Sequence, residues 1–211
     1  MAQWFSLHPD NPQPRLIQQA VQLLRKGGVL AIPTDSCYAL VCHLEDKDAV
    51  GEIRRLRGVD ERHRLSLLCR DLSELANHAR MNNAQFRLVK QHTPGPFTFL
   101  LEATKEVPRR VAHPQRKTIG LRVPDHHGLR QLLQLHGEPL LCTTLIPPGE
   151  SEPMNDASDI RERFQHQVAA VIDAGACSMQ ATTVVDLTPM HHDGDPLLVR
   201  LGGGEISLLG L

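Results

Sequence analysis

Aromatic side chains are scarce in this sequence. Phenylalanine, tryptophan and tyrosine together make up 3% of its 211 residues. Proteins that bind single-stranded nucleic acids stack successive bases on several aromatic side chains. The composition therefore disfavours such a site, and it requires aliphatic side chains to fill the interior.

Net charge and long apolar segments are missing as well. The formal net charge is −1, so no global field attracts nucleic acid or membrane, and any anion site must come from local clustering. No apolar run reaches the length that spans a membrane. The first ten residues lack a basic region followed by an apolar segment, so we expect no export signal.

The cysteines do not indicate a disulfide framework. There are five of them, an odd number, scattered along the chain and mostly within apolar segments. This pattern is typical of buried thiols in a reducing compartment. We therefore expect a cytoplasmic protein without disulfide bonds.

Several familiar catalytic motifs are absent. There is no P-loop and no Gly-x-Ser-x-Gly segment, which excludes the sites built on them. The glycines at 202–204 are followed by no lysine. The histidine pairs at 126–127 and 191–192 have no matching ligand spacing elsewhere, so we predict no metal site.

Strand-like and helix-like segments alternate along the chain, which indicates an α/β fold of several layers. No linker or internal repeat interrupts them, so we expect one domain over residues 1–211. The first helix is expected to be capped by Asp10 or Asn11 and to end at Gly27. Further helices are predicted at 46–57, 71–78, 83–92, 125–136 and 157–165, and strands at 29–32, 65–69, 97–103, 118–123, 140–146, 168–173, 183–187 and 197–201.

The segment from Val29 to Val41 organises the rest of the chain. A short apolar strand is followed by Pro33, which cannot donate to a sheet ladder. Thr34 and other polar side chains come next, as at the floor of a ligand crevice in an α/β protein. The alternative is a turn that merely reverses the chain.

Threonine and serine recur at the ends of predicted strands. Hydroxyls and nearby backbone N–H groups suit phosphate and carboxylate oxygens, so several such strands could line one anion site. The alternative is the ordinary preference of threonine for strands. The residues concerned are Thr34, Ser36, Thr98, Thr143, Thr144, Thr182 and Thr183.

Arginine is clustered locally. Six arginines lie between Arg54 and Arg70. Arg122 lies inside an apolar strand, where an unpaired charge is costly, so it requires a carboxylate partner or a ligand phosphate. Arg200 receives the same interpretation, whereas Arg109, Arg110 and Arg116 are interpreted as a solvated face.

Five ordered motifs resemble the YrdC/YciO family, and together they cover nearly the whole chain. A further segment, Leu67–Leu75, is similar to the YciO branch in particular. The motifs are Pro33-Thr34-Asp35-Ser36-x-Tyr38-Ala39-Leu40, the segment Thr93–Phe99, the segment Lys105–Arg110, the segment Arg116–Pro124 and Thr182–Thr188.

The resemblance implies a three-layer fold in which helices flank a twisted mixed sheet that holds a positively lined cavity. It implies the ligands of the synthase branch, which are ATP with magnesium, L-threonine and bicarbonate. These are joined into threonylcarbamoyl-adenylate for tRNA modification, a nucleotidyltransferase reaction. It also implies a second possibility, a non-catalytic protein that binds double-stranded RNA, tRNA or rRNA through the basic rim.

Site roles follow from the same resemblance. Arg57 and Arg122 would act as catalytic cations on carboxylate or phosphate oxygens. Thr34, Tyr38 and Thr98 would bind the amino-acid substrate. The nucleotide would be held by Thr144, Thr182, Thr183 and Arg200.

The sequence departs from the synthase pattern at three positions. Val59 replaces a cation, His63 replaces a lysine, and Ile146 replaces the asparagine of a Ser-Thr-Ser-x-Asn motif. Loss of such groups from an anion site removes transition-state stabilisation. A weak or altered activity is therefore predicted.

Overall fold

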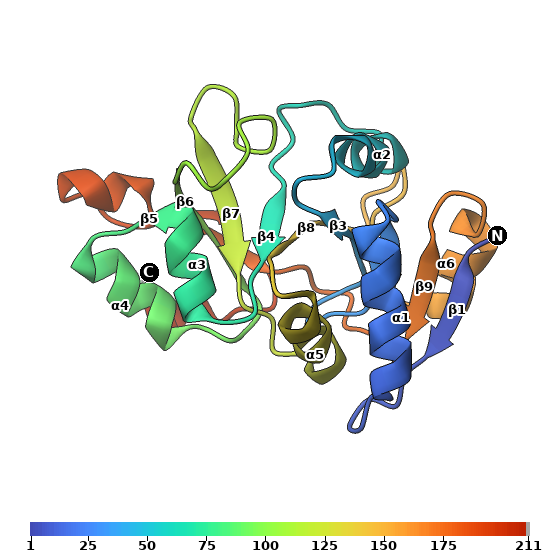
Figure 1. Cartoon of the computed structure of the whole chain (residues 1–211). Helices are drawn as coiled ribbons and strands as arrows, with labels where there is room; N and C mark the ends of the chain where they lie inside the picture. Colours follow the sequence, from blue (N-terminus) through green and yellow to red (C-terminus); the bar gives the residue numbers. More distant parts are fainter. Residues whose placement is uncertain (210–211) are drawn as a thin grey trace.

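The computed structural model describes residues 1–209 of the chain and contains a central mixed sheet with helices packed on it (Figure 1). The sheet has eleven strands in the order β1-β9-β2-β3-β8-β4-β7-β6-β10-β11, and β5 pairs with β6. The strands are β1 (Gln3–Ser6), β2 (Leu30–Ile32), β3 (Ala39–His43), β4 (Ser66–Leu68), β5 (Ala79–Arg80), β6 (Phe97–Ala103), β7 (Thr118–Arg122), β8 (Leu140–Thr144), β9 (Ala170–Asp173), β10 (Thr183–Asp186) and β11 (Leu197–Arg200). The helices are α1 (Pro14–Arg25), α2 (Lys47–Arg57), α3 (Leu72–His78), α4 (Asn83–Gln91), α5 (His127–His136) and α6 (Ala157–Phe164), with 3-10 turns at Thr188–His192 and Ile206–Leu209.

Helices cover both faces of the middle of the sheet, which confirms the layered α/β prediction. Successive residues of a strand point to opposite faces. Leu30 and Ile32 of β2 therefore pack with the apolar faces of α1 and α5, while Ala31 between them belongs to the core formed with α2 and α6. Figure 1 shows α1 and α5 side by side, close to β3 and β8.

The turn interpretation of the Val29–Val41 segment is confirmed, and the ligand-crevice interpretation stays a prediction. β2 pairs antiparallel with β3, and Ile32 lies opposite Ala39, so residues 33–38 do reverse the chain. β3 continues into an antiparallel pair with β8, in which Ala39 lies opposite Thr144. The reversal thus places the polar residues of the turn beside the end of β8.

Capping residues fix several helix ends where the sequence predicts them. The Asp46 carboxylate accepts a hydrogen bond from the Ala49 N–H at 2.9 Å and begins α2, and Gly58 ends the helix in the left-handed conformation with φ of 63°. Glycine adopts this conformation without the Cβ clash of other residues. Asp71 caps α3 in the same way.

Two predicted caps are wrong. Gln13 rather than Asp10 or Asn11 occupies the N-cap of α1 and makes no side-chain cap bond; its Oε1 accepts the His8 N–H at 3.2 Å instead. The last helix before β8 begins at His127 rather than Asp125, since the His126 imidazole accepts the Leu129 N–H at 3.2 Å.

Three strands were not predicted. One is β1, which pairs in parallel with β9. The others are β3, which directly follows the turn at residues 33–38, and β5, which directly follows α3, so neither stands out in the sequence pattern. No helix among the residues described is long and apolar enough to cross a membrane.

Candidate functional site

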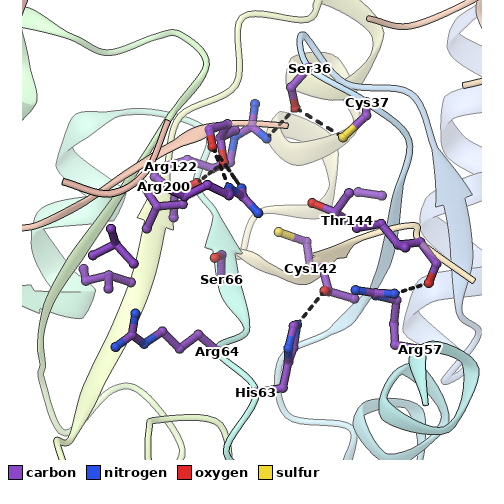
Figure 2. A pocket seen from close by; sticks show the side chains of 18 of the residues that line it. Ser36, Cys37, Arg57, His63, Arg64, Ser66, Arg122, Cys142, Thr144 and Arg200 are labelled. Carbon is purple, nitrogen blue, oxygen red and sulfur yellow. Dashed lines mark hydrogen bonds between the residues drawn. The ribbon is translucent and has the colours of Figure 1, made fainter. Parts of the chain in front are cut away.

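A cavity of about 480 Å³ lies where the ends of several strands meet (Figure 2). Its walls come from the turn before β3, from the segment after α2, and from β4, β6, β7, β8, β10 and β11. The lining residues are Ser36, Cys37, Tyr38, Ala39, Arg57, Arg62, His63, Arg64, Ser66, Thr98, Leu100, Arg122, Cys142, Thr143, Thr144, Ile146, Thr182, Val184, Val199 and Arg200.

The charge of this lining is of one sign. Five arginines line the cavity, and no aspartate or glutamate is among the lining residues. Arginine stays protonated throughout the physiological pH range. The cavity is therefore a local centre of positive charge in a chain whose net charge is −1, as the clustering of arginine predicts.

Arg122, at the end of β7, has the carboxylate partner that its apolar surroundings require. Its Nη2 donates to Asp35 Oδ1, and its Nη1 donates to Ser36 Oγ at 3.2 Å. The side chains of Arg122 and Asp35 are 7% and 9% exposed. The pair thus ties β7 to the turn between β2 and β3, while the Nε of Arg122 is buried without a partner.

Arg57 is the last residue of α2 and enters the cavity from the opposite side (Figure 2). Its Nη1 donates to the carbonyl oxygen of Ile146, and its Nε is buried without a hydrogen-bond partner. Burial lowers the pKa of Arg57. Buried N–H groups without a partner are rare in folded proteins, and a catalytic or binding role is one of their explanations.

Arg200 forms a network with two of the predicted threonines. Its Nε and Nη2 donate to the Thr182 carbonyl at 3.1 and 2.9 Å, and Nη2 also reaches Thr182 Oγ1 at 3.1 Å. The hydroxyls of Thr182 and Thr98 lie 2.9 Å apart. Parallel pairing of β10 with β6, in which Val184 lies opposite Thr98, brings these residues together.

His63 contributes a neutral polar group. Burial lowers its pKa, and the neighbouring Arg57 and Arg54 lower it further. One ring nitrogen lies 3.3 Å from Thr143 Oγ1. A neutral imidazole has one donor and one acceptor nitrogen, so His63 adds hydrogen-bonding capacity but no charge to the lining.

Thr34 and Thr183 lie outside the lining. The Thr34 hydroxyl donates to the Cys37 carbonyl at 2.8 Å, accepts from the Ser36 N–H at 3.0 Å and so shapes the turn. The Thr183 hydroxyl donates to the Gly204 carbonyl at 2.7 Å. Both hydroxyls therefore contact the chain itself in this structure.

Tyr38 lines the cavity but directs its hydroxyl elsewhere. The side chain is fully buried, and the hydroxyl donates to the Gly175 carbonyl at 3.4 Å. Burial raises its pKa, with smaller contributions from Cys177 and Asp173. The tyrosine remains protonated and acts as a hydrogen-bonding wall.

Sequence reasoning did not single out several of the lining residues, among them Ser66, Cys142 and Cys37. Ser66 of β4 lies opposite both Gly120 and Cys142, and Cys37 belongs to the turn. Burial raises the pKa of Cys142 to about 12 and also raises that of Cys37. Both cysteines therefore act as small buried side chains rather than as thiolates, and all five cysteines are free.

Comparisons with known proteins agree with this architecture. The family model for Sua5, YciO and YrdC proteins, described as "Telomere recombination", matches residues 22–202. The chain is 48% identical to the uncharacterized protein YciO of Escherichia coli K12 over 98% of both chains. A crystal structure of E. coli YciO superposes with a TM-score of 0.94, at 47% identity over 99% of this chain and 100% of that one.

More distant relatives carry an activity in their names. A threonylcarbamoyl-AMP synthase of Halorhodospira halophila is 28% identical, over 84% of this chain and 92% of its own. The structure of P. abyssi Sua5 complexed with L-threonine shares the fold, with a TM-score of 0.89 and 24% identity over 99% of this chain and 61% of that one. The match of the family model and the YciO identity over nearly full length establish that this chain belongs to the Sua5/YciO/YrdC family.

Proposed function

We propose that the cavity binds ATP, L-threonine and bicarbonate and forms threonylcarbamoyl-AMP with release of pyrophosphate, at a lower rate than in the synthase branch. The observation that carries this proposal is the lining of five arginines without a carboxylate. Arginine pairs with phosphate and carboxylate oxygens, so such a lining suits a polyanion such as a triphosphate.

Free donors in the lining support an anionic ligand. Asp35 neutralises Arg122, whereas none of the other four lining arginines has a carboxylate within ion-pair distance among the residues described. Arg57 and Arg122 each keep an unpartnered Nε–H. Arginine N–H groups held rigidly by the fold bind phosphate or carboxylate oxygens at little cost in reorganisation.

The chemistry suits such a site. The amine of threonine and bicarbonate give a carbamate with loss of water, and a carbamate oxygen attacks the α-phosphorus while the bond to pyrophosphate breaks. Charge develops on the transferred group and on the leaving pyrophosphate, so the step depends on positioning and on distributed positive charge.

In this proposal Arg57 and Arg200 face the phosphates, and Arg122 holds a carboxylate or phosphate oxygen through its Nε–H. Thr98, Thr144 and Thr182 supply hydroxyls, and Tyr38 closes one wall. Thr34 and Thr183 would take part only if their hydroxyls exchanged their present backbone contacts for ligand oxygens. Magnesium would enter as part of MgATP, held by the phosphates, since no lining carboxylate is available to ligate it.

The reduced rate follows from the three departures. Val59 carries no charge and lies outside the lining, so Arg57 is the cation that the end of α2 supplies to the cavity. Ile146 uses its backbone carbonyl to hold Arg57 and offers no side-chain donor. His63 is held neutral by its surroundings, where a lysine would supply a full charge.

Labelled ATP tests the proposal directly. Purified protein is incubated with ATP, magnesium, threonine and bicarbonate beside a synthase-branch homologue, and pyrophosphate release is followed. We expect release that depends on both threonine and bicarbonate. Arg200→Ala should lower it by about tenfold or more, with partial recovery in Arg200→Lys.

The matched control is Arg109→Ala, which removes an exposed arginine outside the lining and should leave the rate unchanged. Absence of pyrophosphate release under conditions in which the homologue turns over would refute the enzymatic proposal. Turnover within about tenfold of the homologue would show that the departures have little effect.

A second function is favoured by the exposed part of the lining. Arg62 is exposed and Arg64 is half-buried, so the mouth of the cavity presents guanidinium groups to solvent. We propose as the alternative that this rim binds double-stranded RNA without catalysis. Duplex binding that weakens steeply with salt and does not respond to threonine would support it.

A further inference from the structure

A second cluster of polar side chains lies at the far ends of β3 and β8 from the cavity. It comprises His43, the last residue of β3, His136, the last residue of α5, and Glu138, which precedes β8. β3 meets the cavity at Ala39, four residues before His43. The cluster is therefore about 13 Å along the strand from the cavity.

Local structure aims the three side chains at one another. The ligand atoms of the three residues all lie within 4.8 Å of one another. Gly137 ends α5 in the left-handed conformation, with φ of 86°, and this bend directs His136 and Glu138 to the same side. Pairing of His43 with Leu140 places the strand residue opposite them.

His136 has unused ring nitrogens. The residue is 5% exposed, and both Nδ1 and Nε2 are buried without a hydrogen-bond partner. An imidazole normally uses at least one nitrogen when it is buried, because an unpartnered polar group costs free energy.

One spacing within the cluster is close to that of two ligands on a tetrahedral ion, and all the ligand atoms lie within 4.8 Å of one another. His43 Nε2 and Glu138 Oε2 are 3.1 Å apart, and two ligands of a tetrahedral Zn²⁺ ion with bonds of 2.0–2.1 Å are about 3.4 Å apart. Two imidazoles and one carboxylate are a donor set that zinc accepts with a fourth position left to water. Mg²⁺ and Ca²⁺ prefer oxygen ligands only.

We propose that His43, His136 and Glu138 bind a divalent transition-metal ion of the zinc class, separate from the arginine-lined cavity. Binding needs one adjustment. His43 Nδ1 now accepts the Glu45 N–H at 3.1 Å, so the ring proton must move from Nε2 to Nδ1. The Glu45 amide then bonds to water, which its exposed position allows.

The ion would link the end of α5 to the end of β3. Arg25 donates to the His136 carbonyl at 3.1 Å, so one positive charge already lies near this helix end. The Glu138 carboxylate supplies the negative charge that a metal ion requires there. The site is therefore expected to contribute to stability rather than to the reaction in the cavity.

Zinc titration of the metal-free protein tests this assignment. Protein dialysed against a chelator is titrated with Zn²⁺ by calorimetry, and Co²⁺ is added separately to read the ligand geometry from its visible spectrum. We expect one equivalent of Zn²⁺ to bind, a tetrahedral Co²⁺ spectrum, and no comparable binding of Mg²⁺. Glu138→Gln and His43→Gln should each weaken Zn²⁺ binding by about tenfold or more.

The control variant is His127→Gln, which changes an exposed histidine on the same helix outside the cluster. It should bind Zn²⁺ as the unmodified chain does. Glu138 is 60% exposed, so its variant is expected to fold normally, and circular dichroism checks this. No stoichiometric Zn²⁺ binding, or equal binding in Glu138→Gln and His43→Gln, would overturn the proposal.

Discussion

The Asp35–Arg122 pair is the most consequential contact between single residues. Both side chains are more than nine-tenths buried, and the arginine also donates to Ser36 at 3.2 Å. The pair joins the turn before β3 to the end of β7 and fixes one wall of the cavity. The contribution of the Asp35–Arg122 pair to stability can therefore be measured by unfolding the protein without ligand.

Arg122→Ala should lower the free energy of unfolding by about 3–5 kcal/mol, because the Asp35 carboxylate would remain buried without its partner. Urea denaturation measures this change. The double variant Arg122→Met with Asp35→Leu removes both charges and should recover most of the loss. A single variant that loses less than about 1 kcal/mol would show that the carboxylate finds water instead.

His136 makes stability depend on pH. Its pKa is about 4 in the folded chain and about 6.5 when unfolded. Between these values the unfolded chain binds the proton and the folded chain does not, so the free energy of unfolding decreases as the pH falls through this range. The decrease attributable to His136 is about 3 kcal/mol, measurable by denaturation with a chelator present.

His136→Asn removes the titrating group and should flatten that slope. Burial also lowers the pKa of His63 and His126, so part of the slope remains. An unchanged slope in His136→Asn would contradict the role assigned to this histidine.

Among the elements, α2 shows how a local signal positions a functional side chain. Gly58 lies in the left-handed region, and a Cβ there would come within 3.1 Å of the Pro148 Cβ. Arg57 immediately precedes it, and Pro148 follows the segment that holds Arg57. Gly58 therefore fixes both the end of α2 and the position of the Arg57 guanidinium.

Gly58→Ala should destabilise the protein by about 1–2 kcal/mol, since alanine is strained at positive φ and meets Pro148. Gly51→Ala is the matched control. Gly51 lies within α2, and a Cβ there would meet nothing within 4 Å, so alanine should stabilise the helix by about 1 kcal/mol. Thermal unfolding of the two variants in opposite directions would bear this out, whereas equal shifts would contradict it.

Elements with strong end signals were predictable from the sequence, and those fixed by pairing were not. Asp46 with Gly58 gave the bounds of α2, and the Pro94–Pro96 segment marked the start of β6. β3 was missed because only its pairing with β2 and β8 distinguishes it from the turn. The Arg122 partner and the lining residue Ser66 depend likewise on registers between distant strands, which a single sequence does not encode locally.

At the scale of the whole molecule, the sheet order converts scattered motifs into one cavity. Residues as far apart in sequence as Ser36 and Arg200 line it together. Thr98, Thr144, Thr182 and five arginines line this one cavity, as the resemblance to the family implies, and the roles assigned to them stay predictions. The His43, His136 and Glu138 cluster was not predicted, because its members belong to no contiguous motif.

Arg200 reaches the cavity from β11, the last strand of the sheet, which among residues 1–209 pairs only with β10 and has all four residues exposed. An anion that binds this guanidinium would also hold β11 in place. Binding in the cavity and ordering of this edge strand are therefore thermodynamically coupled. We expect nucleotide to slow amide hydrogen exchange across Leu197–Arg200, and Arg200→Ala to abolish that slowing. Amide hydrogen exchange in β11 would then report whether the cavity is occupied, whichever reaction follows.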